Sequence, residues 1–160
     1  MLRQALRGTQ LVTYEMALET PDREGDVILA AGGNSMSPRR FLISSKVLSL
    51  ASPVFAALFG PQFLEGSRMA EHGPITILLD EDDAKTMEIM LRILHHQTPS
   101  KIENLTTKEM ATLAILSDKY DCAGVIRPWT SKWFFRHENM PNLEDYGLIL
   151  TAAHFFTRLR

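Results

Sequence analysis

Residues 41–66, FLISSKVLSLASPVFAALFGPQFLEG, decide the fold, because they are helix-like almost throughout and yet carry Pro53 near the centre. The residue before this proline is Ser52. A serine at a helix N-cap accepts a hydrogen bond from a free backbone N–H, and proline suits the next position because its missing N–H is not needed there. The stretch therefore predicts two helices that meet at Ser52, rather than one helix broken by a proline.

Each of these two helices has its own ends and its own buried face. Ser44 or Ser45 caps the first helix, and the pair Gly60-Pro61 ends the second. Apolar residues recur at helical spacing in both, so each is expected to pack on one side. The side chains predicted to face the core are Val47, Leu48 and Ala51 in the first helix and Val54, Phe55, Leu58 and Phe59 in the second.

Short apolar runs on both sides of this stretch indicate strands. Residues 26–31 form one run that stops at Gly32-Gly33-Asn34, residues 41–43 form a second, and residues 75–79 form a third. A brief apolar run bounded by turn residues is typical of a buried strand. The first two strands are predicted to form a loose hairpin through the loop at 32–39.

The rest of the chain is predicted to be helical. Asp80 to Asp83 suit a helix start, because acidic side chains favour the positive end of the helix dipole. Further helices are expected from residues 106–107, over 123–135 and over 143–159, and Pro128 requires a kink or a late start in the second of these. Consecutive helices do not fit the strand–helix alternation of a doubly wound sheet. The inward positions are Met87, Met90, Leu91 and Leu94, then Met110, Leu113 and Ala114, then Leu148, Ala152, Phe155 and Leu159.

Composition limits the class of protein. The chain has 160 residues, 45% of them hydrophobic, which suffices for one domain with its own core. Its formal net charge is -2, so neither a broad basic surface nor a nucleic-acid partner is expected.

The single cysteine, Cys122, excludes a disulfide within one chain and indicates a reducing compartment. No stretch approaches the roughly 20 apolar residues of a membrane span, and the N-terminal residues lack the apolar core of a signal peptide. A cytoplasmic or nuclear protein without membrane contact is therefore expected.

Several motifs occur in a fixed order along the chain. Asp26-Val27-Ile28-Leu29 is followed by Phe41-x-Ile43-x4-Leu48-x3-Ser52-Pro53-x-Phe55, by Ile77-x-Leu79 and by Leu113-Ala114-x-Leu116-x-Asp118-Lys119-Tyr120-Asp121-Cys122. This series resembles a BTB/POZ domain, and the wording of SSKVLSLASPVF, LHHQ and DKYDC is similar to the fungal BTB-domain proteins. The resemblance covers residues 24–122. It leaves 1–23 as an N-terminal leader or exchanged strand and 123–160 as a C-terminal helical extension.

The resemblance implies an α+β fold, in which a cluster of helical hairpins is capped by a small mixed β-sheet and extra helices follow at the C-terminus. It implies a protein–protein interaction module rather than an enzyme, and no cofactor. BTB domains commonly form homodimers; some bind a cullin scaffold as substrate adaptors of ubiquitin ligases, and others serve transcription factors. The alternative to an adaptor is a stand-alone oligomerisation or scaffolding domain, including the transcription-regulator type, without a ligase.

Phe63-Leu64-Glu65 stands where cullin-binding members carry an apolar residue, any residue and a glutamate. The resemblance implies that Phe63 inserts into a pocket on the cullin, that Glu65 makes a charged hydrogen bond at its rim, and that Phe59 belongs to the same docking surface. An aromatic anchor beside a polar contact is the usual composition of an interface hot spot. The alternative is that Phe63 packs under the loop and Glu65 is solvated.

Two departures from the family pattern bear on dimer and groove contacts. Ser44 and Ser45 stand where many BTB domains have a histidine and then a basic residue, so Asp26 lacks its charged partner. The absence of this charged pair weakens the hypothesis that a dimer of this chain binds corepressors in a groove, as transcription-factor members do. The sequence also lacks the C-x2-C and H-x3-H pairs of a zinc finger, so a DNA-binding output is not expected in this chain. The candidate dimer residues are Val12, Tyr14, Met16, Leu18, Asp26 and Val47.

Residues 12–18 alternate between apolar and polar side chains with the period of a half-buried strand. A lone strand leaves its backbone groups unpaired and needs a neighbour's edge, as in the strand that dimeric members exchange. A short helix or a disordered leader fits the same residues. The two interpretations stay open at the level of sequence.

Three further features have both a chemical and a structural interpretation. His95-His96 suggests a metal ligand, but adjacent histidines diverge on a helix, so a role at the helix end is favoured. Cys122 suggests a reactive thiol, or else packs with Tyr120 at the join of two helices. The sequence contains no G-x-S-x-G nucleophile elbow, and no catalytic residue is predicted. Three aromatic side chains belong either to the core, which is favoured, or to a partner-facing patch: Trp129, Trp133 and Phe134.

Overall fold

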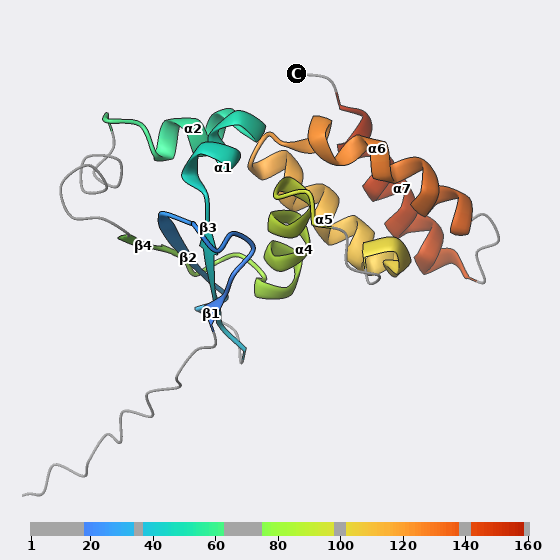
Figure 1. Ribbon diagram of the computed structural model, residues 1–160. Helices are drawn as coiled ribbons and strands as arrows, with labels where there is room; N and C mark the ends of the chain where they lie inside the picture. Colours follow the sequence, from blue (N-terminus) through green and yellow to red (C-terminus); the bar gives the residue numbers. More distant parts are fainter. Residues whose placement is uncertain (1–17, 34–36, 63–74, 98–101, 138–141, 159–160) are drawn as a thin grey trace, which may run out of the picture.

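A small mixed sheet lies at one side of a cluster of helices (Figure 1). The computed structural model describes residues 18–33, 37–62, 75–97, 102–137 and 142–158. The sheet has the strand order β1-β3-β2-β4, with β2 antiparallel to β3, and with the pairs β2–β4 and β1–β3 parallel. The strands are β1 (Leu18–Glu19), β2 (Val27–Ala31), β3 (Arg39–Ile43) and β4 (Ile75–Leu79). This arrangement confirms the predicted α+β class.

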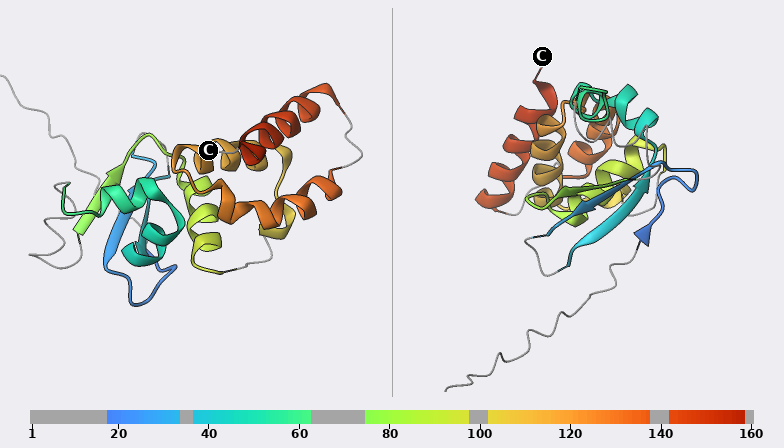
Figure 2. Two further views of the ribbon diagram at one scale, coloured as in Figure 1. Left: turned by 90° about the horizontal axis from the view of Figure 1, so that it is seen from above. Right: turned by 90° about the vertical axis from the view of Figure 1, so that its left-hand side faces the viewer.

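The other regular elements of the described chain are helices. α1 and α2 lie beside the sheet, and Figure 2 shows α5, α6 and α7 side by side, farther from it. The bounds are α1 (Ser45–Ala51), α2 (Pro53–Leu58), α4 (Ala84–Leu94), the 3-10 helix η1 (Ile102–Asn104), α5 (Thr107–Lys119), α6 (Ala123–Arg136) and α7 (Leu143–Thr157).

The three strands predicted from short apolar runs are confirmed as β2, β3 and β4. In the sheet Leu29 lies opposite Phe41 on one side and Ile77 on the other, and all three side chains are buried. Of the segment predicted as an alternating strand, Leu18 alone is described, as the first residue of β1; residues 12–17 lie outside the described ranges. The predicted hairpin of β2 and β3 is present as an antiparallel pair.

One continuous hydrophobic core runs from the sheet into the helical cluster. It takes its helical side chains mainly from α4 and α5, where the predicted inward positions are all buried. Asp83 caps α4 through its carboxylate, and Thr106 with Glu109 forms a capping box at the start of α5. At the far end, Trp133 and Phe156 are buried within the same cluster. The core therefore includes the helices beyond residue 122.

The serine–proline junction between α1 and α2 has the predicted geometry. The Ser44 hydroxyl accepts a hydrogen bond from the Val47 N–H at 3.3 Å, and the Ser52 hydroxyl accepts one from the Phe55 N–H at 3.0 Å. Ser52 also donates to the backbone carbonyl of Tyr120 at 2.5 Å, 68 residues further along the chain. This buried serine thus caps a helix and joins two distant parts of the fold.

Three details differ from the predicted inward faces and helix ends. Val54 is exposed, because Phe55 and Phe59 form the inner row of the short α2 and Val54 faces away from it. α6 begins at Ala123 and contains Pro128, so the late start is wrong. In α7 the fully buried aromatic residue is Phe156, and Phe155 is half-buried.

His95 connects the end of α4 to the start of α1. Its Nδ1 lies 2.8 Å from the Leu91 carbonyl oxygen, and its Nε2 accepts a hydrogen bond from the Ser44 N–H at 3.1 Å. Both contacts require a neutral ring with the proton on Nδ1. Burial lowers the pKa of His95 below its ordinary value. The predicted helix-end role is confirmed, but it rests on these hydrogen bonds rather than on a charged imidazole at the helix dipole.

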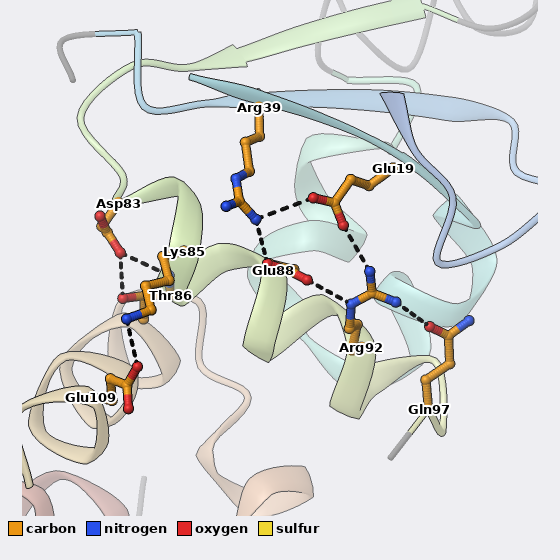
Figure 3. Close-up of polar contacts among 9 residues, drawn as sticks. All are labelled: Glu19, Arg39, Asp83, Lys85, Thr86, Glu88, Arg92, Gln97 and Glu109. Atoms are coloured by element: carbon orange, nitrogen blue, oxygen red, sulfur yellow. Dashed lines mark hydrogen bonds and ion pairs between the residues drawn. The ribbon is translucent and has the colours of Figure 1, made fainter. Parts of the chain in front are cut away.

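Alternating charges attach the sheet to α4 (Figure 3). Arg39 on β3 contacts Glu19 at 3.1 Å and Glu88 at 2.5 Å. Arg92 contacts the same two carboxylates, Glu88 at 2.9 Å and Glu19 at 2.7 Å. Gln97 extends the network, since it accepts from Arg92 at 3.0 Å. Two arginines and two glutamates from three elements therefore neutralise each other where β1, β3 and α4 meet.

We predict that Ser52→Ala lowers the free energy of unfolding by about 1 to 2 kcal/mol. The variant loses the N-cap of α2, and the Tyr120 carbonyl loses its hydrogen-bond donor as well. The matched control is Ser44→Ala, whose half-buried cap should cost about 0.5 to 1 kcal/mol. Urea unfolding followed by circular dichroism measures both. An equal loss in the two variants would show that the Ser52–Tyr120 bond adds nothing.

A pH effect should follow from His95. Its folded pKa lies below the unfolded value, so the stabilisation is fully present above about pH 6.5 and is lost as the pH falls towards the folded pKa. In His95→Gln, unfolding stability should lack this part of its pH dependence between neutral and acidic pH. His96→Gln is the control, since His96 is exposed and next in sequence. The same pH profile in wild type and His95→Gln would contradict the assignment.

Candidate functional site

An apolar depression, which we call the docking hollow, lies on the surface where α2 meets the end of β4 and the end of α5. It encloses about 570 Å³ and is open to solvent. α2 ends at Leu58, so residues 63–65 follow its lining residues closely in the sequence. The side chains that line it are Pro53, Val54, Ala57, Leu58, Leu79, Tyr120 and Asp121.

Tyr120 is the most firmly held residue of the docking hollow. Its ring stacks on Phe55 with 4.4 Å between centroids, and its hydroxyl donates to the buried carboxylate of Asp82 at 2.5 Å. Lys119 contacts the other oxygen of Asp82 at 2.6 Å. Burial, and then the hydrogen bond to Asp82, raise the pKa of Tyr120 far above its ordinary range. The phenol therefore stays protonated and fixes one wall of the hollow.

Phe59 is the one residue of the predicted cullin-docking set that is described. It is half-buried and stacks on Phe55 with ring centroids 5.8 Å apart, so part of its surface already belongs to the core. Phe63, Leu64 and Glu65 lie outside the described residues. Their docking role stays a prediction.

Sequence reasoning missed most of the docking hollow. Leu79, Tyr120 and Asp121 come from elements far from α2 in sequence, and spacing alone does not indicate that these elements meet. One local signal existed: a large aromatic residue between charged residues at the end of α5. Asp121 also has a positive φ of 49°, which marks the sharp turn out of that helix.

The candidate dimer residues fall at two places. Leu18 is exposed and pairs with Arg40 of its own chain; Val12, Tyr14 and Met16 are outside the described ranges. Val47 is half-buried and lines a second apolar depression, in which Leu50 is 82% exposed. We call this the α1 surface; its other lining residues are Ala51, Leu94, His96 and Val125.

Asp26 has a local partner rather than a basic one. Its carboxylate accepts hydrogen bonds from the Ser45 N–H at 2.7 Å and from the Ser45 hydroxyl at 2.6 Å. An acidic group at the start of α1 is favourable, because the helix dipole is positive there. Ser45 stands where many BTB domains have a basic residue, and here it forms hydrogen bonds to Asp26 of the same chain.

The remaining chemical candidates belong to the interior. Burial raises the pKa of the Cys122 thiol to about 12, and its Sγ lies 3.6 Å from the sulfur of Met90, so a reactive thiolate is not available. Trp133 is core and donates to the Ile102 carbonyl at 2.7 Å, while Trp129 is half-buried.

The described ranges lack two further features. No group of three or more His, Cys, Asp and Glu side chains that could hold a metal ion occurs there. In the same ranges no helix is both long and apolar enough to span a bilayer.

Comparison with protein families gives a match to the BTB/POZ domain over residues 17–132. Comparison with curated protein sequences gave no match. The family match spans most of the chain and includes all four strands, the serine–proline junction and the docking hollow. The chain therefore belongs to the BTB/POZ family, whose domains are protein–protein interaction modules with protein partners and a tendency to self-associate.

Proposed function

We propose that the chain acts as an adaptor-type docking module that binds a cullin scaffold of a ubiquitin ligase. The observation that carries this proposal is the docking hollow, an apolar concavity whose α2 residues shortly precede Phe63-Leu64-Glu65 in the sequence. A concave apolar surface with few polar groups is the usual form of a pocket that accepts an anchor side chain. The hollow and Phe63 would then meet the same partner.

Rigidity of the hollow supports tight docking. Tyr120 is held by Phe55 and Asp82, and α2 is fixed by the Ser52 bond to the Tyr120 carbonyl. A preformed surface loses less conformational entropy on association than a mobile one. Asp121 at the rim favours a partner with a basic or hydrogen-bond donor group beside its apolar anchor.

We infer the type of BTB protein, its compartment and its domain bounds from the sequence. The motifs SSKVLSLASPVF, LHHQ and DKYDC favour a fungal type of BTB protein. We propose a non-enzymatic protein of the cytoplasm or nucleus, with residues 24–122 as the interaction domain between an N-terminal leader or exchanged strand (1–23) and a C-terminal helical extension (123–160).

A second candidate function is a stand-alone scaffold that only oligomerises. One observation favours it: the α1 surface exposes Leu50 beside Val47 and Val125 with no charged residue among its lining side chains. Exposed contiguous apolar residues mark association sites. In this alternative the α1 surface would join two copies, and the docking hollow would stay unused.

For the adaptor, we predict that Ala57→Glu weakens binding to the N-terminal region of a cullin scaffold at least tenfold, or about 1.4 kcal/mol, because it places a charge in the docking hollow. Ala56→Glu is the control, since Ala56 is the adjacent exposed alanine of α2 and does not line the hollow. Binding is measured by titration calorimetry, and folding by circular dichroism. Phe63→Ala should also weaken binding. Equal affinity of Ala57→Glu and Ala56→Glu would reject the hollow as the docking site.

For the scaffold, we predict that Leu50→Glu lowers the affinity of self-association at least tenfold, because it buries a carboxylate in the α1 surface. Leu78→Glu is the control, since Leu78 is another leucine, 66% exposed, on β4 at the far edge of the sheet. Sedimentation equilibrium gives the association constants. If both variants associate as the wild type does, the α1 surface is not the contact.

A further inference from the structure

α6 carries basic charges alone. Its charged residues are Arg127, Lys132 and Arg136, and no Asp or Glu occurs in this fully described helix. The chain as a whole has a formal net charge of -2. α6 is therefore a positive element of a slightly acidic protein, and Figure 1 shows it along the upper edge of the helical cluster.

The outward side of α6 is centred on an aromatic ring. Phe135 is 76% exposed, whereas Ile126, Thr130 and Trp133 are buried. Successive residues of a helix are about 100° apart, so Phe135 lies almost directly opposite the three buried side chains. Packing within the described chain therefore does not account for this phenylalanine.

Cations border Phe135 on both sides. At the same helical spacing, Arg127 lies towards one border of the outward side, while Lys132 and Arg136 lie towards the other. All three side chains are exposed. We call these four residues the α6 face.

The contacts that these cations make inside the chain are weak ones. Lys132 Nζ lies 2.8 Å from Glu103, in a pair whose two side chains are nearly half exposed, and Arg136 donates to the side chain of Asn104. An exposed ion pair contributes little to stability, because water screens it. Among the described residues, neither Arg127 nor Arg136 has a carboxylate partner. Two guanidinium groups of the α6 face are thus available to carboxylates of another molecule.

We propose that the α6 face binds an acidic segment of a partner protein, in which an apolar side chain covers Phe135 and carboxylates pair with Arg127 and Arg136. Aromatic residues and arginine are the residue types that dominate interface hot spots. The planar guanidinium matches a carboxylate with two parallel hydrogen bonds.

Charge complementarity selects this occupant. A basic segment would be repelled, and an uncharged one would remove two guanidinium groups from water without a compensating partner. Nucleic acid requires a broader basic surface than one helix face on a chain of net charge -2. Glu103, at the border of the face, also opposes a continuous polyanion. A protein segment with a few carboxylates around an apolar residue meets all of these conditions.

The α6 face is separate from the surfaces described above. None of its four residues lines the docking hollow or the α1 surface. The proposal therefore goes beyond cullin docking and does not depend on it. An acidic partner at α6 and a cullin at the hollow could bind the same molecule.

A charge test uses a short synthetic peptide in which glutamates surround one leucine, titrated against the full chain at low ionic strength by fluorescence anisotropy. Arg127→Glu should weaken binding at least tenfold. The matched control is Arg23→Glu, an exposed arginine outside α6 whose replacement changes the net charge equally and should leave the affinity unchanged. Equal losses in the two variants would overturn the proposal, because net charge alone would then explain binding.

A second test separates the apolar anchor from the charges. Phe135→Ala should weaken binding of the same peptide at least tenfold, whereas Tyr146→Ala, which removes an aromatic residue 51% exposed on α7, should not. Circular dichroism checks that each variant is folded. The peptide with glutamine in place of every glutamate should bind at least tenfold more weakly than the acidic one. Equal affinity for the two peptides would overturn the proposal.

The class of partner and the independence from the hollow are tested with the same readout. Vesicles of anionic phospholipid and a single-stranded oligonucleotide serve as the other anionic probes. Binding of either one more tightly than the peptide, with the same dependence on Arg127 and Phe135, would overturn the assignment to a protein. Ala57→Glu, in the docking hollow, should leave peptide binding unchanged, so a failure of cullin docking and a failure of the α6 face give different results.

Discussion

The fold depends on one buried hydroxyl group. Ser52 Oγ accepts the Phe55 N–H and donates to the Tyr120 carbonyl, and the Tyr120 hydroxyl in turn donates to Asp82. These bonds join the α1–α2 junction, the end of α5 and the loop between β4 and α4. An unsatisfied buried polar group is costly, so all of these hydrogen bonds have to be kept at once. Each bond therefore limits how the elements joined by the others can be placed. The docking hollow is lined by α2, by the end of β4 next to that loop and by the end of α5, so the packing that closes the core also shapes the surface.

The sheet is attached to the helices in a different way. Beside the shared apolar core, charged side chains join β1 and β3 to α4 through Glu19, Arg39, Glu88 and Arg92. Each arginine contacts both carboxylates, so no member of the network stands as a lone charge. At the end of α4, the neutral ring of His95 adds an uncharged link to α1. Exchange of one member would leave its partners incompletely neutralised, and a network of this kind fixes the relative position of elements more than it adds to stability.

Local patterns were enough to predict much of this structure. The helix start predicted at Ser52-Pro53 follows from backbone hydrogen bonding alone, and it was confirmed. The buried face of α4, predicted from the spacing of Met87, Met90, Leu91 and Leu94, was also confirmed. Contacts between distant residues were not predictable in this way. No single position of the sequence indicates the Ser52–Tyr120 hydrogen bond or the docking hollow, because both depend on how α2 and α5 meet. Val54 shows the same limit, since in a helix of six residues the inner face is decided by its neighbours in space.

The docking hollow and the α1 surface are separate apolar depressions, since they share no lining residue. The docking hollow is concave, so its complement is a projecting side chain of another kind of surface, and a second hollow does not fill it. The α1 surface is lined by other residues, so contact with a second copy there would not fill the hollow. Self-association through the α1 surface and partner binding at the hollow are therefore compatible in one molecule. Two copies joined in this way would present two docking hollows, and a partner with two anchors would then bind more tightly through effective concentration, without any additional contact at either hollow.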